Sequence, residues 1–83
     1  MPEDYRLQEV FDSLQKYSGG ADVFEHFRDQ TFFRYSPEER LIVLTGWDRM
    51  MESETKPSRA TAELISKKRE LDAMHELLTR AGR

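Results

Sequence analysis

The stretch SRATAELISKKRELDAMHELLTRA, residues 58–81, contains no glycine and no proline. These two residues are the least favourable in helix interiors, so the stretch predicts one uninterrupted helix. Its apolar residues recur in alternating steps of four and three, a period near 3.5 residues that brings two helices together side by side. The sequence therefore predicts a long C-terminal helix with a packing face formed by Ala60, Leu64, Lys67, Leu71, Met74, Leu78 and Ala81.

The length of this helix suggests that the chain does not act alone. The helix would measure about 36 Å at the usual rise per residue. A compact chain of 83 residues has a radius of gyration of about 12 Å, and so a diameter near 30 Å. We therefore expect the helix to extend beyond its own domain or to be covered by a second chain.

Two shorter helices are predicted before it. Pro2 with the acidic residues that follow it favours a helix start, and Gly19-Gly20 favours a stop, so the first helix spans about residues 3–18. Asp22 can cap a second helix that runs to about Gln30. Residues 31–35, with the sequence TFFRY, are expected to be extended or turn-like.

Residues 36–39, with the sequence SPEE, combine a capping serine, a proline at the first helical position and a glutamate three residues after the serine. They predict a third helix through Met51, although Gly46 is unfavourable inside a helix. An alternative remains, because LIVLT at residues 41–45 favours a strand and SPEE is also an acceptable turn. That alternative gives an α+β fold with a short hairpin at residues 31–45. We predict an all-α fold of three to four helices, with residues 1–83 as a single helical domain.

The composition excludes several classes of protein. There is no cysteine, which excludes disulfides and thiolate metal sites. No apolar run approaches the ~20 residues that span a bilayer, and the first residues are acidic where a signal peptide is basic. We expect a cytoplasmic protein without a membrane partner. Because a core of this size is only marginally stable, a partner or self-association is the usual way to add buried surface.

No catalytic, cofactor or metal motif is present. His26 and His75 are the two histidines, and Asp72 lies one helical turn before the second. A di-metal site in a helical bundle needs two such turns and further carboxylates, and only one is found. There is also no glycine-flanked serine, and Gly19-Gly20 is too short to hold a phosphate. We predict no catalytic residues, no metal and no cofactor, and hence a chain that is not an enzyme.

The expected function is protein binding. Trp47, Met50 and Met51 are large and adaptable side chains of the kind enriched at interface centres, although a core position explains them as well. We predict a small non-enzymatic regulator, inhibitor, adaptor or assembly factor, of the size common among phage and plasmid proteins. It would bind an unidentified protein and form a homodimer. The predicted interface is Leu64, Lys67, Leu71, Met74, Leu78, Trp47, Met50 and Met51.

An alternative function is binding of DNA or RNA. Residues 1–55 hold six basic and twelve acidic side chains, whereas residues 56–83 hold seven basic and four acidic ones, so the last helix carries the positive charge. A helix that enters the major groove needs such a basic face. The acidic first part of the chain opposes this function. The residues for this alternative are Arg59, Lys67, Lys68, Arg69 and Arg80.

Overall fold

A computed structural model of the chain describes residues 7–16, 20–53 and 59–83. The elements are α1 (Leu7–Lys16), α2 (Gly20–His26), α3 (Pro37–Glu52) and α4 (Arg59–Arg80). A π-helical turn η1 (Phe27–Thr31) and a 3₁₀ turn η2 (Phe32–Arg34) continue α2. Every element in these described ranges is helical, so the all-α prediction is confirmed and the hairpin at residues 31–45 is wrong. The predicted helix starts at Pro2 and Ser58 and the stop at Gly19 lie outside the described residues.

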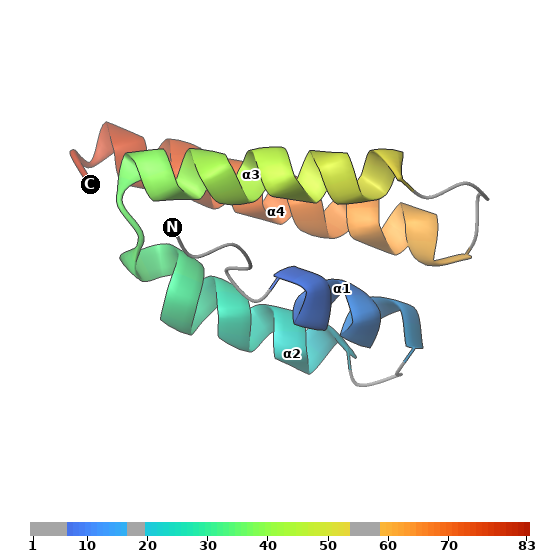
Figure 1. Cartoon of the computed structure of the whole chain (residues 1–83). Coiled ribbons are helices and arrows are strands. Elements are labelled where there is room, and N and C mark those ends of the chain that lie inside the picture. The colour runs from blue at the N-terminus through green and yellow to red at the C-terminus, as the bar shows by residue number, and fades with distance from the viewer. Residues whose placement is uncertain (1–6, 17–19, 54–58) are drawn as a thin grey trace.

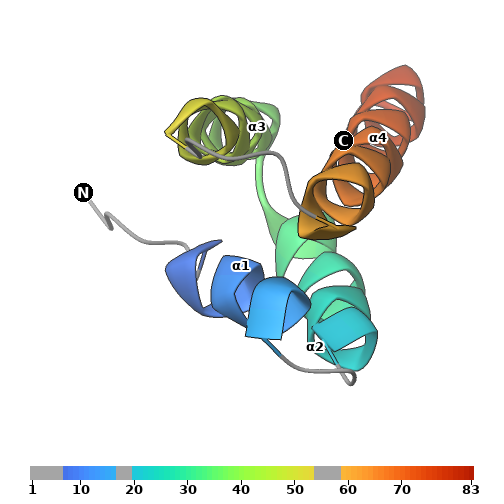
Figure 2. The same cartoon turned by 90° about the vertical axis from the view of Figure 1, so that its right-hand side faces the viewer.

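The helices form two antiparallel pairs. α3 and α4 run side by side in opposite directions, and α1 and α2 form the second pair beside them (Figures 1 and 2). The radius of gyration is 12.4 Å, but the body is elongated, with extents of 38 × 23 × 22 Å. α4, about 33 Å long, lies along the long direction with α3 beside it (Figure 1). The chain therefore covers one face of its long helix with its own residues.

Trp47 of α3 is the centre of the core. Its side chain is fully buried, and the ring centroids of Phe11 and Phe24 lie 4.7 and 5.9 Å from its own in edge-to-face arrangements. The indole N–H donates a hydrogen bond of 3.1 Å to the main-chain oxygen of Leu64. One side chain thus joins α1, α2, α3 and α4.

The predicted packing face of the long helix is confirmed over its described part. Leu64, Leu71 and Leu78 are buried, and Lys67 and Met74 between them are half-buried. The face packs against α1 and α3 of the same chain. Of the two alanines that were placed at its ends, Ala81 is exposed and the side chain of Ala60 lies outside the described residues.

The turn-like alternative for residues 31–35 agrees with the 3₁₀ turn η2, and Tyr35 after it is extended. The extended alternative is wrong up to Arg34, because the chain stays helical there. The reason lies in the spacing of two phenylalanines. Phe27 and Phe32 are both buried, with ring centroids 6.4 Å apart, although they are five residues apart in the sequence. An α-helix places residues three or four apart on one face, whereas a π turn closes over five. The extra residue of η1 therefore lets both rings reach the core.

Gly46, in the middle of α3, allows α1 to approach closely. A Cβ atom at this position would lie 2.9 Å from the Cδ1 of Leu7. Because glycine has no side chain, the Leu7 methyl group can occupy that space. The glycine that is unfavourable for an isolated helix is therefore explained by the packing of two helices.

The start of α3 has the predicted capping box. Glu39 N–H donates to Ser36 Oγ at 3.2 Å, Ser36 N–H donates to Glu39 Oε1 at 3.0 Å, and Pro37 is the first helical residue. Replacing Ser36 with alanine should lower the free energy of unfolding by about 1 kcal/mol, because one N–H at the helix start loses its acceptor. Urea denaturation followed by circular dichroism measures the change. Ser66→Ala on the exposed side of α4 is the control and should not destabilise, since alanine is the better helix former. Equal stability of Ser36→Ala and the wild type would contradict the cap.

Candidate functional site

The structure uses several of the predicted interface residues for the chain's own core. Trp47, Leu64 and Leu71 are at most 2% exposed, and Leu78 is 7% exposed. A side chain with so little exposed surface cannot contact a partner in this conformation. The residues whose periodicity suggested an interface are therefore core residues of the single chain, and the contact surface must be sought among exposed side chains.

The remaining predicted interface residues are at the edge of the core. Met50, Met51 and Met74 are half-buried and pack against the buried cluster. Met51 also lines a shallow hollow between α3 and α4, beside Ile65. Met74 lies on another side of α4, in a larger groove. The predicted patch of Trp47, Met50 and Met51 is thus not a continuous exposed surface.

An apolar groove lies between α4 and the turns η1 and η2. Its volume is about 460 Å³, and its rim carries Phe33, 37% exposed, and Leu77, 64% exposed. Leu77 is the most exposed large apolar side chain in the described part of the chain. Exposed apolar side chains that gather in one groove are typical of a binding surface, whereas scattered ones are not. The groove is lined by Arg28, Asp29, Phe33, Glu70, Ala73, Met74, Leu77 and Leu78.

Ion pairs occupy one end of this groove. Arg28 pairs with Asp29 at 2.8 Å and with Glu70 at 2.7 Å, and Lys67 pairs with Glu70 at 3.2 Å and with Glu63 at 3.4 Å. The hydrogen bond from Arg28 lowers the pKa of the exposed Asp29 carboxyl. Burial lowers the pKa of the Lys67 ammonium, but the two glutamates outweigh it and raise that pKa overall. Two cations, Arg28 and Lys67, and three carboxylates, Asp29, Glu63 and Glu70, meet at this end, so its net charge is −1.

The other end of the groove carries an arginine. The guanidinium carbon of Arg83 lies 4.5 Å from the centre of the Phe33 ring, a cation–π arrangement. Within residues 7–16, 20–53 and 59–83, no carboxylate pairs with this guanidinium. Apolar side chains therefore line the groove between the ion pairs at one end and the Arg83 guanidinium at the other end, which η2 and the C-terminal turn of α4 form.

Arg40 fixes the position of Arg83. Its side chain, on the first turns of α3, is 1% exposed and donates to His75 Nδ1 at 2.9 Å and to the main-chain oxygen of Tyr35 at 2.8 Å. It also donates to the main-chain oxygen of Arg83 and, at 3.5 Å, to Thr79 Oγ1. Burial and the charge of Arg83 lower the pKa of Arg40, which nevertheless stays charged because a guanidinium is not deprotonated in proteins. Sequence reasoning missed this residue, although Arg40, Val43, Leu44 and Trp47 share one face at helical spacing.

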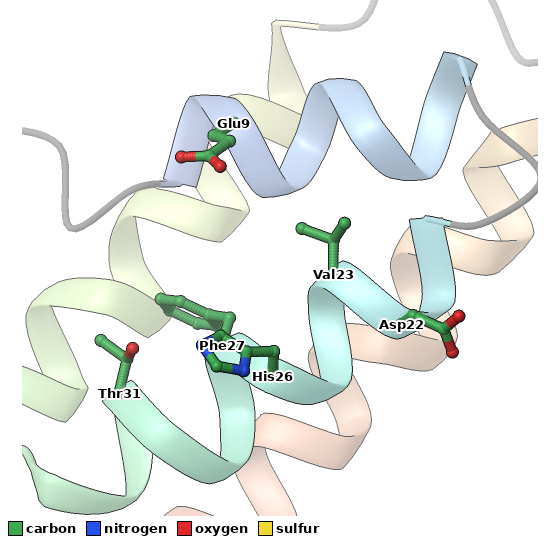
Figure 3. Close-up of a pocket in the computed structure, with 6 residues that line it drawn as sticks. All are labelled: Glu9, Asp22, Val23, His26, Phe27 and Thr31. Atoms are coloured by element: carbon green, nitrogen blue, oxygen red, sulfur yellow. The ribbon is translucent and has the colours of Figure 1, made fainter.

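A second hollow lies between α1 and α2, and its described lining has no set of side chains arranged for catalysis or metal binding. Its volume is about 320 Å³, and Figure 3 shows Val23 extending from α2 toward α1, with Asp22 pointing away from that space. His26 and Glu9 stand at its edge. His75, the other histidine, lies on α4 and accepts a hydrogen bond from Arg40 of α3. Within the described ranges, no group of three histidines and carboxylates is placed to hold a metal ion.

The residues of the nucleic-acid alternative do not form one face. The Lys67 ammonium lies 5.5 Å from the Phe24 ring of α2, whereas Lys68 pairs with Asp48 of α3 at 3.4 Å and with Asp72 at 3.0 Å. The two lysines thus lie on opposite sides of the buried leucines of α4. Arg80 pairs with Glu76 at 2.7 Å, Arg69 is exposed, and the side chain of Arg59 lies outside the described residues.

Comparisons with protein-family models, with curated protein sequences and with solved structures found no match to this chain. In the ranges that the structure describes, none of the helices has the length and apolar character needed to cross a bilayer.

Proposed function

We propose that this chain is a non-enzymatic protein-binding module that acts through the apolar groove between α4 and the turns η1 and η2. The observation that carries the proposal is the exposure of Phe33 and Leu77 on the rim of one groove whose floor is Met74 and Leu78. Burying exposed apolar surface is the main favourable contribution to protein association. A groove along a helix fits the apolar face of an amphipathic helix, whose anchors recur at three and four residues.

The charges on α4 favour a protein partner over a nucleic acid. Lys67, Lys68 and Arg80 already pair with carboxylates of this chain. A contact between one of these side chains and a phosphate would have to replace such an ion pair. Residues 1–55 also carry a net charge of −6, which repels phosphates. The apolar groove, in contrast, needs no rearrangement to accept an apolar side chain.

Selection of displayed helical peptides tests the proposal. The wild type should select peptides with large apolar residues at helical spacing, and Leu77→Glu should bind them at least about tenfold more weakly, which corresponds to ~1.4 kcal/mol. Glutamate is a good helix former and Leu77 is exposed, so this variant should fold.

Ile65→Glu is the matched control for this experiment. Ile65 is 37% exposed on the same helix but does not line the groove, so this variant should bind the selected peptides like the wild type. Peptides that bind Leu77→Glu as tightly as the wild type, or a selection without any binder, would contradict the proposal.

A further inference from the structure

The exposed side of α3 has the chemistry that the groove requires. Val43, Leu44 and Trp47 direct one face of α3 into the core, so Leu41 and Ile42 lie on the outer side, 53% and 38% exposed. They are two of the five large apolar side chains that the described surface exposes, and Phe33 and Leu77 in the groove are two of the others. We call residues Glu38, Leu41, Ile42 and Thr45, all exposed, the α3 ridge.

The α3 ridge also carries a charge opposite to that of Arg83 at one end of the groove. Glu38 lies three and four residues before Leu41 and Ile42, so its carboxylate sits one helical turn from both apolar side chains. Within the described ranges, no cation pairs with Glu38. At the open end of the groove, Arg83 is likewise without a carboxylate partner among the described residues. An apolar pair with a carboxylate one turn away therefore matches an apolar groove with a guanidinium at one end.

We propose that the occupant of the groove is the α3 ridge of a second copy of this chain, with Leu41 and Ile42 against Leu77 and Phe33, and Glu38 paired with Arg83. This inference rests on the proposed function, because it assigns a partner to the same groove. A second copy as the occupant also explains why one chain exposes two separate apolar surfaces, the α3 ridge and the rim of the groove.

The contact joins two different surfaces, and this determines the kind of assembly. α3 packs against one side of α4. Arg28 of η1 pairs with Glu70 of α4, and Lys67 of α4 lies over the Phe24 ring of α2, so η1 and α2 lie against another side of α4 (Figure 2). The ridge, on the outer side of α3, and the groove therefore lie on different sides of the bundle. Each copy then offers a free groove at one end of an assembly and a free ridge at the other. Such a head-to-tail contact extends into a ring or a filament and does not stop at a symmetric dimer.

Two complementary blocked variants test this arrangement. Leu41→Glu destroys the ridge and keeps the groove, and Leu77→Glu destroys the groove and keeps the ridge. In sedimentation between about 10 μM and about 1 mM, the range of weak contacts, the mass of the wild type should rise with concentration beyond that of a dimer. Each variant alone should stay monomeric. An equimolar mixture should form a 1:1 dimer and nothing larger, because the two altered surfaces are both acidic and repel each other.

A charge exchange tests the pairing of Glu38 with Arg83. Glu38→Arg and Arg83→Glu should each weaken association at least about fivefold, because loss of one charged partner at such a contact costs ~1 kcal/mol. The double variant should recover most of the loss.

A monomeric wild type at the highest concentration, or a mixture of blocked variants that stays monomeric, would overturn the second-copy occupant. Neither result affects the peptide selection, in which Leu77→Glu is compared with Ile65→Glu, so the two proposals fail separately. Assembly of Leu41→Glu and Leu77→Glu to the same extent as the wild type would also overturn it.

Discussion

Replacing Trp47 with alanine is expected to lower the free energy of unfolding by about 3–5 kcal/mol. The change removes a fully buried ring, its edge-to-face contacts with Phe11 and Phe24, and the hydrogen bond to the main-chain oxygen of Leu64. A chain of 83 residues has only about 4–12 kcal/mol of unfolding free energy at the usual stability per residue. The loss is therefore about a quarter or more of the total stability, and urea denaturation should show unfolding at a markedly lower urea concentration.

Trp47→Phe separates the contributions to this effect. It keeps an aromatic ring in the centre of the core and removes the indole N–H, so the loss should be smaller than with alanine. A Trp47→Ala variant that unfolds at nearly the wild-type urea concentration would show that Trp47 is not a core residue, and would return it to the candidate interface.

Replacing Arg40 with methionine should cost about 1–3 kcal/mol, since three acceptors around a buried guanidinium lose their donor. The acceptors concerned are His75 Nδ1 and the main-chain oxygens of Tyr35 and Arg83. Methionine keeps much of the volume of the side chain, so the effect reports hydrogen bonding more than packing. Amide hydrogen exchange should accelerate at Thr79–Arg83, because the end of α4 loses its attachment to α3.

Arg49→Met is the matched control, on the same helix but exposed. It should change the unfolding free energy by less than about 1 kcal/mol, the size of a surface or helix-end charge effect. Arg40→Lys should lie between the wild type and Arg40→Met, because an ammonium cannot reproduce the fork of a guanidinium. An Arg40→Met variant as stable as the wild type would mean that the cost of burying the guanidinium equals the gain from its hydrogen bonds.

Local signals of the sequence were sufficient for most of the fold. The box of Ser36 and Glu39 with Pro37 is a short-range pattern with a defined hydrogen-bonding outcome, and α3 begins where it predicts. The 3.5-residue period of α4 correctly predicted that Leu64, Leu71 and Leu78 share a packing face. Such signals depend on residues within one or two turns of each other, which is why they can be read from the sequence.

What could not be predicted depends on contacts between distant residues. Periodicity shows that a face is buried but not what buries it, so the leucines of α4 suggested a partner chain although α1 and α3 cover them. Lys67 and Lys68 are adjacent in the sequence, but each pairs toward a different neighbouring helix. The groove needs Phe33 and Leu77, 44 residues apart, to meet, and this follows only from the helical path of residues 27–34.

The π turn at Phe27–Thr31 is also the place where the chain can lose a residue. Asp29 and Gln30 are exposed, and loss of one such residue would remove no side chain from the core. Phe27 and Phe32 would then be four residues apart, and an ordinary α-helical turn places residues at this spacing on one face. Both rings would stay in the core and Phe33 would stay on the rim of the groove, so a single deletion here should be tolerated in evolution.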